Sequence, residues 1–284
     1  MSRAKRISKI SKIKISGLSV SIGGSQILSG VSFETEPGSL TFIIGRNGAG
    51  KSTLFKCVTG VLKNYGGAID INGVPVSSLS ARDRAKLVAY VPQSSPGDVP
   101  YTVADFLEMS RYPWRSLSSE ADDRRAVADA MNMTGVEALS GRRLSSLSGG
   151  ERQKVMIASA IAQESGIILM DEPTTYLDYA HQVETMEVMA RVNRERGVTL
   201  IVVTHDVNLA IGMASPKEKE SQKGEMAGVK VVALAGGRLT WTGPPSGLLE
   251  PGRLDEIYGV RFRQFTSGNP CEYPVLVPEM GARI

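Results

Sequence analysis

Hydrophobic and polar positions alternate along two stretches near the start of the chain, residues 13–21 and 27–34. Such alternation is typical of half-buried β-strands, and the pair Gly23-Gly24 between the stretches suits a turn. A continuous apolar run follows at 40–44, as in a strand buried inside a parallel sheet. The pattern therefore predicts an N-terminal hairpin followed by a buried strand.

Helical spacing begins after this strand. Residues 51–62 predict a helix, and 68–76 predict a small hairpin that turns at Asn72-Gly73. The following segment, about 94–147, changes character and is predicted to be a helical insertion.

Two helices are expected within the insertion. Thr102 is suited to cap a helix that runs to Arg111, and Gly135 is suited to end a helix over 121–133.

Strands and helices alternate in the second half. Apolar runs at 167–170 and 199–203 predict buried strands, and the helix between them is capped by Asp178 and ended by Gly197. This alternation predicts an α/β fold with a mostly parallel sheet. Side chains that recur every three residues along the helix are expected to form its buried stripe: Val183, Met186, Met189 and Val192.

The C-terminal part is less regular. Residues 215–230 are charged and poor in large apolar side chains, which indicates an exposed loop. A further hairpin is predicted over 231–235 and 239–242. Six prolines after residue 243 interrupt the remainder, so we expect a tail over 251–284 rather than a second domain.

Composition narrows the possible functions of this chain. It has 284 residues, of which 42% are apolar and 22% charged, as in an ordinary globular protein. The net charge is +4, but residues 1–14 hold six basic and no acidic side chains, which leaves 27 basic against 29 acidic residues elsewhere. A nucleic-acid-binding protein needs a basic face on its folded body, so that function is not expected.

The sequence indicates neither a secretory signal nor a cysteine ligand site. The first residues lack the apolar core of a secretory signal, and no apolar stretch is long enough to span a bilayer. Cys57 and Cys271 have no ligand-like spacing, so we expect reduced thiols, with Cys57 packed in a core.

The strongest chemical motif follows the strand at 40–44. It matches G-x-x-x-x-G-K-[S/T] and lies between a predicted strand and a predicted helix. Its glycines allow backbone amides to surround phosphates, its lysine supplies charge at the β and γ phosphates, and its serine supplies a hydroxyl for magnesium. The motif comprises Gly45, Arg46, Asn47, Gly48, Ala49, Gly50, Lys51 and Ser52.

Two carboxylates follow the strand at 167–170. Magnesium bound to a nucleotide is held jointly by the hydroxyl of the phosphate loop and an acid at the end of a neighbouring strand, and Asp171 supplies that acid. Glu172 comes next, where it could act as general base on an attacking water.

Three further strings complete the pattern. Val91-Pro92-Gln93 precedes the helical insertion, Leu147 to Glu151 reads Leu-Ser-Gly-Gly-Glu at the start of a helix, and His205 directly follows the strand at 199–203. Each string is weak alone, but their order beside the phosphate loop is informative.

With these motifs, the chain resembles the ATP-binding cassette (ABC) ATPases over about residues 12–250. The resemblance implies a P-loop NTPase core with an N-terminal antiparallel β subdomain and a helical subdomain between Gln93 and the signature. It identifies Gly45 to Thr53 as the Walker A loop, with ATP and magnesium as cofactors. The remaining functional positions that it implies are Gln93 (Q-loop, magnesium), Ser148, Gly149 and Gly150 (signature), Asp171 (Walker B, magnesium), Glu172 (catalytic base), Asp178 (D-loop) and His205 (switch).

The resemblance also implies an organisation. We divide the chain into a basic arm over 1–11, an ATPase domain over 12–250 and a tail over 251–284. Within the ATPase domain, the helical subdomain spans about 94–150 and the charged insertion about 215–230. In this family two copies pair head to tail, with ATP between one Walker A loop and the opposite signature, so one chain holds half of each site.

One position departs from the family pattern. An aromatic residue before the second strand commonly stacks on adenine in these cassettes, and Ile22 corresponds to it here. The adenine contact would then be apolar packing.

The motif spacing and local strings favour a transport subunit. The separation of 97 positions from Lys51 to Ser148 leaves no room for the long coiled coil of DNA-repair relatives. Strings at 110–113 and 172–178, with His181-Gln182, resemble importers of iron-siderophore, heme and cobalamin complexes.

This subgroup implies specific partners and a location. They are a second copy of the chain, a polytopic membrane permease and, indirectly, an extracytoplasmic substrate-binding protein, with the cassette peripheral on the cytoplasmic face of the cell membrane. Tyr101, Tyr112 and Trp114 would contact the permease or else pack within the helical subdomain. The alternative function is a soluble ABC ATPase in cytosolic assembly, such as iron-sulfur cluster biogenesis.

Overall fold

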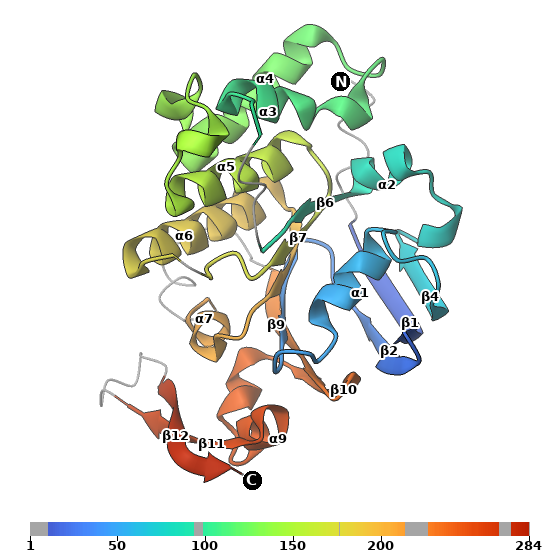
Figure 1. Ribbon diagram of the computed structural model, residues 1–284, viewed down its shortest axis with the longest axis vertical. Coiled ribbons are helices and arrows are strands. Elements are labelled where there is room, and N and C mark those ends of the chain that lie inside the picture. The colour runs from blue at the N-terminus through green and yellow to red at the C-terminus, as the bar shows by residue number, and fades with distance from the viewer. Residues whose placement is uncertain (1–10, 94–98, 176, 214–226, 267–273, 284) are drawn as a thin grey trace.

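A computed structural model describes residues 11–93, 99–175, 177–213, 227–266 and 274–283. Three sheets are present in this part of the chain: one of four strands, one of six and one of two. Figure 1 shows the four-stranded sheet and helix α1 (Lys51–Val58) on one side of the large sheet, and helices α5 (Gly149–Ala162) and α6 (Tyr179–Arg196) on the other.

The four-stranded sheet is the predicted N-terminal β subdomain. Its buried side chains alternate along the first strand in two pairs, Ile13 with Ile15 and Leu18 with Val20, and an irregularity in the strand register separates the pairs. All its pairs are antiparallel, in the order β2-β1-β4-β5. The strands are β1 (Ile13–Ile22), β2 (Ser25–Glu34), β4 (Gly66–Ile71) and β5 (Val74–Pro75).

The six-stranded sheet carries the phosphate loop. Its order is β10-β9-β3-β8-β7-β6, and every neighbouring pair is parallel except the β9–β10 hairpin. This confirms the predicted α/β fold with a mostly parallel sheet. The strands are β3 (Ser39–Ile44), β6 (Val88–Val91), β7 (Ile167–Asp171), β8 (Thr199–Val203), β9 (Ala227–Ala235) and β10 (Arg238–Gly243).

The sheet separates two hydrophobic cores. Successive side chains of β3 point to opposite faces, so Phe42 packs with the helical side and Ile43 with the N-terminal subdomain. Cys57 on α1 is fully buried in the second core, as expected. Helix α1 ends at Val58, earlier than predicted, because Gly60 adopts a left-handed conformation just beyond it.

The helical insertion packs against α5. It contains α3 (Val103–Met109), capped by Thr102 as predicted, and α4 (Glu120–Thr134), ended by Gly135. Helix α2 (Ala81–Leu87) leads into β6. The indole N–H of Trp114 donates a hydrogen bond to the carbonyl oxygen of Gln163 at 2.6 Å, and the ring is buried. Trp114 is therefore a packing residue, which decides between the two roles considered for it.

The predicted buried stripe of α6 was wrong at one end. Met189 and Val192 are fully buried, but Val183 is 54% exposed. A helix turns by about 100° per residue, so side chains nine residues apart lie on opposite faces. A spacing of three residues throughout cannot keep one face buried.

The expected loop over 215–230 was wrong at its C-terminal end. Residues 227–230 belong to β9, which pairs with β3 through Val229 opposite Leu40 and Lys230 opposite Thr41. The ammonium group of Lys230 also donates to the carbonyl oxygen of Glu34. The rest of the expected loop, through residue 226, lies outside the described residues.

The C-terminal tail contains regular structure. Helix α9 (Arg253–Tyr258) leads into a two-stranded antiparallel sheet of β11 (Val260–Phe265) and β12 (Val275–Arg283). Figure 1 shows these elements below α7 (Val207–Gly212), at the end of the molecule that holds the phosphate loop. Within the described part of the chain, no helix is long and apolar enough to cross a bilayer.

Candidate active site

The loop between β3 and α1 requires glycine at three positions. Gly45, Gly48 and Gly50 have φ values of 143°, 81° and 94°, a region that other residues rarely adopt. A Cβ atom on Gly45 would stand 2.1 Å from the carbonyl oxygen of Leu234 on β9. The loop therefore lies tightly against the sheet at the N-terminus of α1, where backbone amides favour anions.

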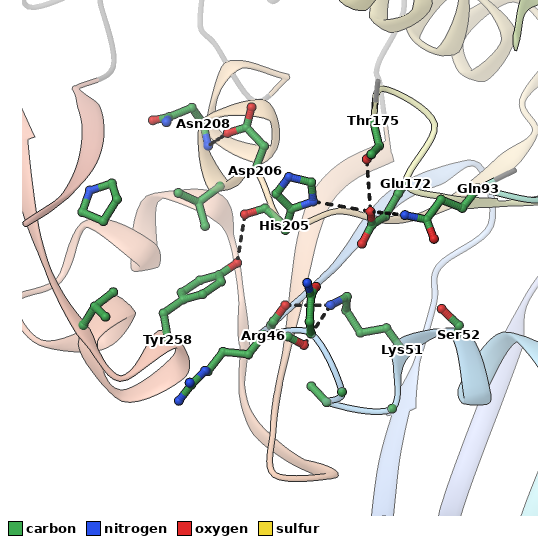
Figure 2. Close-up of a pocket in the computed structure, with 18 of the residues that line it drawn as sticks. Arg46, Lys51, Ser52, Gln93, Glu172, Thr175, His205, Asp206, Asn208 and Tyr258 are labelled. Carbon is green, nitrogen blue, oxygen red and sulfur yellow. Dashed lines mark hydrogen bonds and ion pairs between the residues drawn. The ribbon is translucent and has the colours of Figure 1, made fainter. Parts of the chain in front are cut away.

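Lys51 begins α1, and its ammonium group reaches back over the loop (Figure 2). Nζ donates hydrogen bonds to the carbonyl oxygens of Gly45 at 2.7 Å and Arg46 at 3.0 Å. The residue is 6% exposed, and this burial lowers the pKa of Lys51, although Glu172 and Asp171 act in the opposite direction. A buried cation inside a loop of backbone dipoles is suited to phosphate groups.

Asp171 ends β7 beside the phosphate loop and is 4% exposed. Burial raises the pKa of Asp171, while hydrogen bonds from Ser52 and Tyr90 act to lower it. The Tyr90 hydroxyl donates to Oδ2 of Asp171 at 3.3 Å. A hydroxyl and a carboxylate in contact are the hard oxygen ligands that magnesium prefers, so these residues fit that ion.

Glu172 lies in a cluster of polar side chains around its Oε2 atom. Gln93 donates to this atom at 2.8 Å and Thr175 at 3.1 Å, and Nδ1 of His205 lies 3.5 Å from it (Figure 2). The backbone of Glu172 has a φ of 49°, which is uncommon outside glycine. Its amide is fixed by a hydrogen bond to Val203 of β8 at 2.9 Å. Strand β8 thus fixes the backbone that carries the carboxylate.

Apart from Asp171 and its partner Tyr90, these groups line one cavity of about 1200 Å3. It takes in the whole predicted loop from Gly45 to Thr53, together with Gln93, Glu172 and His205. Among the described residues that line it, none belongs to the signature. The structure therefore brings together one half of the predicted site.

The signature lies on a separate surface. The Ser148 side chain caps α5 by accepting a hydrogen bond from the Glu151 amide. His181 on α6 packs on Gly150, because a Cβ atom there would come within 2.4 Å of the His181 ring. Asp178 binds the His181 amide at 2.9 Å and its Nδ1 at 2.8 Å. The predicted signature and D-loop residues are therefore joined to each other.

Sequence reasoning missed one wall of the cavity. Thr175 lay inside a matched string, but no local motif marks the others, which come from α7 and the C-terminal tail. Ile22 is 50% exposed and does not line the cavity, whereas Ile27 at the start of β2 does. The additional lining residues that bear on the chemistry are Thr175, Asn208, Tyr258, Phe262, Leu276 and Pro278.

Comparison with known proteins agrees with the motifs. The family model described as ABC transporter matches residues 28–175. The chain is 38% identical to the hemin import ATP-binding protein HmuV of Streptomyces coelicolor, over 85% of this chain and 81% of that protein. It is also 38% identical to the iron(3+)-hydroxamate import ATP-binding protein FhuC of Bacillus subtilis, over 68% of this chain and 72% of that protein.

Solved structures share the fold. A metal-chelate type ABC transporter in an inward-facing conformation aligns with a TM-score of 0.78 at 22% identity, over 95% of this chain and 98% of that one. An ATP-binding cassette dimer bound to ADP and phosphate after hydrolysis aligns with a TM-score of 0.69 at 25% identity, over 82% and 98%. The phosphate loop, the acid-ended strand and these matches agree: the chain belongs to the ABC transporter family and is one of its ATP-binding, ATP-hydrolysing subunits.

Proposed function

We propose that this chain powers the import of a metal chelate through a separate membrane permease. An iron-siderophore complex is the first candidate cargo, with heme or cobalamin next. The names of two relatives support this: the hemin import protein and the iron(3+)-hydroxamate import protein are each 38% identical to this chain. The observation that carries the ATPase role is the cavity that joins the phosphate loop to Gln93, Glu172 and His205.

Glu172 is the proposed general base. Its carboxylate lines the cavity beside the phosphate loop, and the Gln93 amide and Thr175 hydroxyl both donate to its Oε2. These contacts orient the carboxylate toward a water that attacks the terminal phosphate. His205 lies next to the same oxygen and is placed to contact the terminal phosphate or the attacking water.

Lys51 and the loop amides are proposed to bind the phosphates. The lysine would exchange its bonds to the Gly45 and Arg46 carbonyls for bonds to phosphate oxygens. Ser52 and Asp171 would hold magnesium, which offsets negative charge on the phosphates. Gln93 was also expected there, and its amide nitrogen faces Glu172 instead, so its oxygen is the atom available to the ion.

The second half of each site is proposed to come from a second copy. The signature serine and glycines lie apart from the chain's own phosphate loop, so Ser148, Gly149 and Gly150 would contact ATP bound to the partner. The dimeric relatives support this arrangement. ATP binding would close the dimer, and hydrolysis would reopen it, giving two states that drive transport.

The permease is proposed to dock on the helical subdomain. A groove of about 700 Å3 there has three large exposed side chains in its wall, Tyr101, Met109 and Tyr112. Its other lining residues are charged: Asp105, Glu108, Arg111, Arg115 and Asp123. Large apolar side chains gathered along one surface groove mark an interaction site. Its occupant would be a cytoplasmic loop of the permease, and the cassette would then lie on the cytoplasmic face of the membrane. An extracytoplasmic binding protein would deliver the chelate on the other side.

Co-purification tests this function. The tagged chain is isolated from native membranes in mild detergent, and the proteins that accompany it are identified by mass spectrometry. We expect a polytopic permease whose presence changes the ATPase rate. Purely soluble partners would contradict the importer and favour a cytosolic assembly ATPase.

Two variants test whether the permease docks at this groove. Tyr112→Ala is expected to reduce permease recovery at least fivefold without changing the ATPase rate of the chain alone. Val61→Ala is the control, because Val61 is an apolar side chain that is 75% exposed but follows α1 and does not line the groove. Equal recovery with both variants would contradict docking at the groove.

A further inference from the structure

The C-terminal tail contacts the loop of the switch histidine. The Tyr258 hydroxyl, at the end of α9, donates a hydrogen bond to the backbone carbonyl oxygen of His205 at 3.4 Å (Figure 2). The ring of Tyr258 packs on that of Phe262, with 5.6 Å between ring centroids. Both side chains line the nucleotide cavity. The hydroxyl is therefore directed from the tail to the backbone of a proposed active-site residue.

The same hydroxyl adjoins the phosphate loop. Burial raises the pKa of Tyr258, although the nearby backbone of Gly45 acts to lower it, so the group stays protonated and able to donate. The next residue, Gly259, lies under the Arg46 guanidinium, since a Cβ atom there would be 3.1 Å from a nitrogen of Arg46. The end of α9 thus contacts the loop and the switch histidine together.

A second connection joins the tail to the helix after His205. The side-chain amide of Asn208 on α7 donates to the Leu276 carbonyl oxygen at 3.0 Å, and its oxygen accepts from the Leu276 amide at 2.8 Å. The side chain of Asp206 in turn accepts a hydrogen bond from the backbone amide of Asn208 at 2.9 Å. The Asn208 side chain thus satisfies both the N–H and the C=O group of Leu276, which fixes β12 to α7.

We propose that the tail is a positioning element of the ATP site, with Tyr258 and Asn208 as positioning residues for His205. Tyr258 fixes the backbone of His205 itself, and Asn208 fixes the start of the helix that follows it. The inference rests on the proposed role of His205 in hydrolysis, but not on the identity of the cargo or the permease.

The geometry explains why this support matters. The His205 side chain is 56% exposed, and its Nδ1 atom lies 3.5 Å from Oε2 of Glu172. Little packing therefore holds the His205 ring in place. A displacement of about 1 Å in a reacting group can reduce turnover by up to about 100-fold. Two fixed points on the tail would restrict the backbone that carries this ring. Substrate affinity depends mainly on the phosphate loop and should change less.

Two near-isosteric variants test the proposal in the full chain. Tyr258→Phe keeps the ring packing and removes the hydroxyl. Asn208→Asp keeps an acceptor for the Leu276 amide but places an oxygen against the Leu276 carbonyl. For each we expect kcat for ATP hydrolysis to fall about tenfold while the Kd for ATP changes less than twofold. Because both residues act on the loop of His205, the fall in kcat of the double variant should be smaller than the product of the two single falls.

Phe265→Ala serves as the tail control, since Phe265 is exposed at the far end of β11. Its kcat should stay within twofold of the unchanged chain. Melting temperatures of all variants are measured alongside, because a tail that only covers the core would lower them without a selective fall in kcat.

The outcomes separate this proposal from the one on which it rests. If His205→Ala abolishes turnover while Tyr258→Phe and Asn208→Asp retain it within twofold, the positioning role of the tail is overturned. If His205→Ala itself retains full turnover, the assigned role of His205 is wrong, and a fall in kcat for the tail variants would contradict positioning through that residue.

Discussion

Nε2 of Gln93 donates a hydrogen bond to Oε2 of Glu172 at 2.8 Å. The two residues are 79 positions apart in the chain, and parallel strands bring them together, because β6 and β7 are neighbours in the large sheet. Gln93 also precedes the helical insertion that carries the proposed permease groove. A movement of that insertion would therefore reach the proposed base through one side chain.

Glu172→Gln is the first prediction. The amide keeps the size of the side chain but cannot take a proton from water, so we expect turnover to fall by about 100- to 1000-fold with ATP binding retained. Phosphate release measures turnover, and light scattering should detect an ATP-dependent dimer that accumulates. Glu195→Gln is the control, because Glu195 forms only an exposed ion pair with Arg191 on α6. Substantial hydrolysis by Glu172→Gln would exclude this residue as the base.

Lys51→Ala should act on binding instead. Its ammonium group is the buried cation over the phosphate loop, and its loss leaves the phosphates without their nearest positive side chain. We expect the Kd for ATP, measured by calorimetry, to rise at least about tenfold. Lys56→Ala changes a lysine in the last turn of the same helix and should leave the Kd within twofold. A similar Kd for both variants would show that Lys51 does not bind the phosphates.

The sequence predicted the parts of the site that depend on local chemistry. The glycines of the phosphate loop, the acid at the end of β7 and the Asp178 cap are each specified by a few adjacent residues, and the structure has them in the expected elements. The wall formed by Tyr258 and Leu276 was missed because it depends on long-range packing of the tail, for which no short motif exists.

The errors in the fold have related causes. The Val183 error came from treating a spacing of three residues as one helical face. Residues 227–230 read as a loop because they follow a charged segment and contain no large apolar side chain, but pairing with a buried neighbour made them a strand. Tertiary pairing overrides local strand preference in such segments.

The thiol of Cys57 should be protected in the folded chain. Burial raises the pKa of Cys57 from 9.0 to about 11, so the thiolate fraction at pH 8 falls by about 100-fold. With Cys271→Ser in place, iodoacetamide should label Cys57 at least about 100-fold faster in urea than in buffer. Equal rates in the two conditions would show that α1 does not shield the thiol.

Gly150→Ala should break the contact between the signature helix and the D-loop. The new Cβ atom would stand 2.4 Å from the His181 ring, and the ring cannot move aside without losing its bond to Asp178. We expect the free energy of unfolding in urea to fall by about 1–2 kcal/mol.

Adding His181→Ala to Gly150→Ala removes the clash and should recover most of this loss, which would assign the effect to that one contact. Gly149→Ala is the matched control, because nothing lies within 4 Å of the Cβ position of Gly149 and alanine favours a helix. Its stability should be unchanged or slightly higher. If Gly150→Ala were as stable as Gly149→Ala, the His181 ring would not be held on the signature helix, and Asp178 would be free to move independently of Ser148.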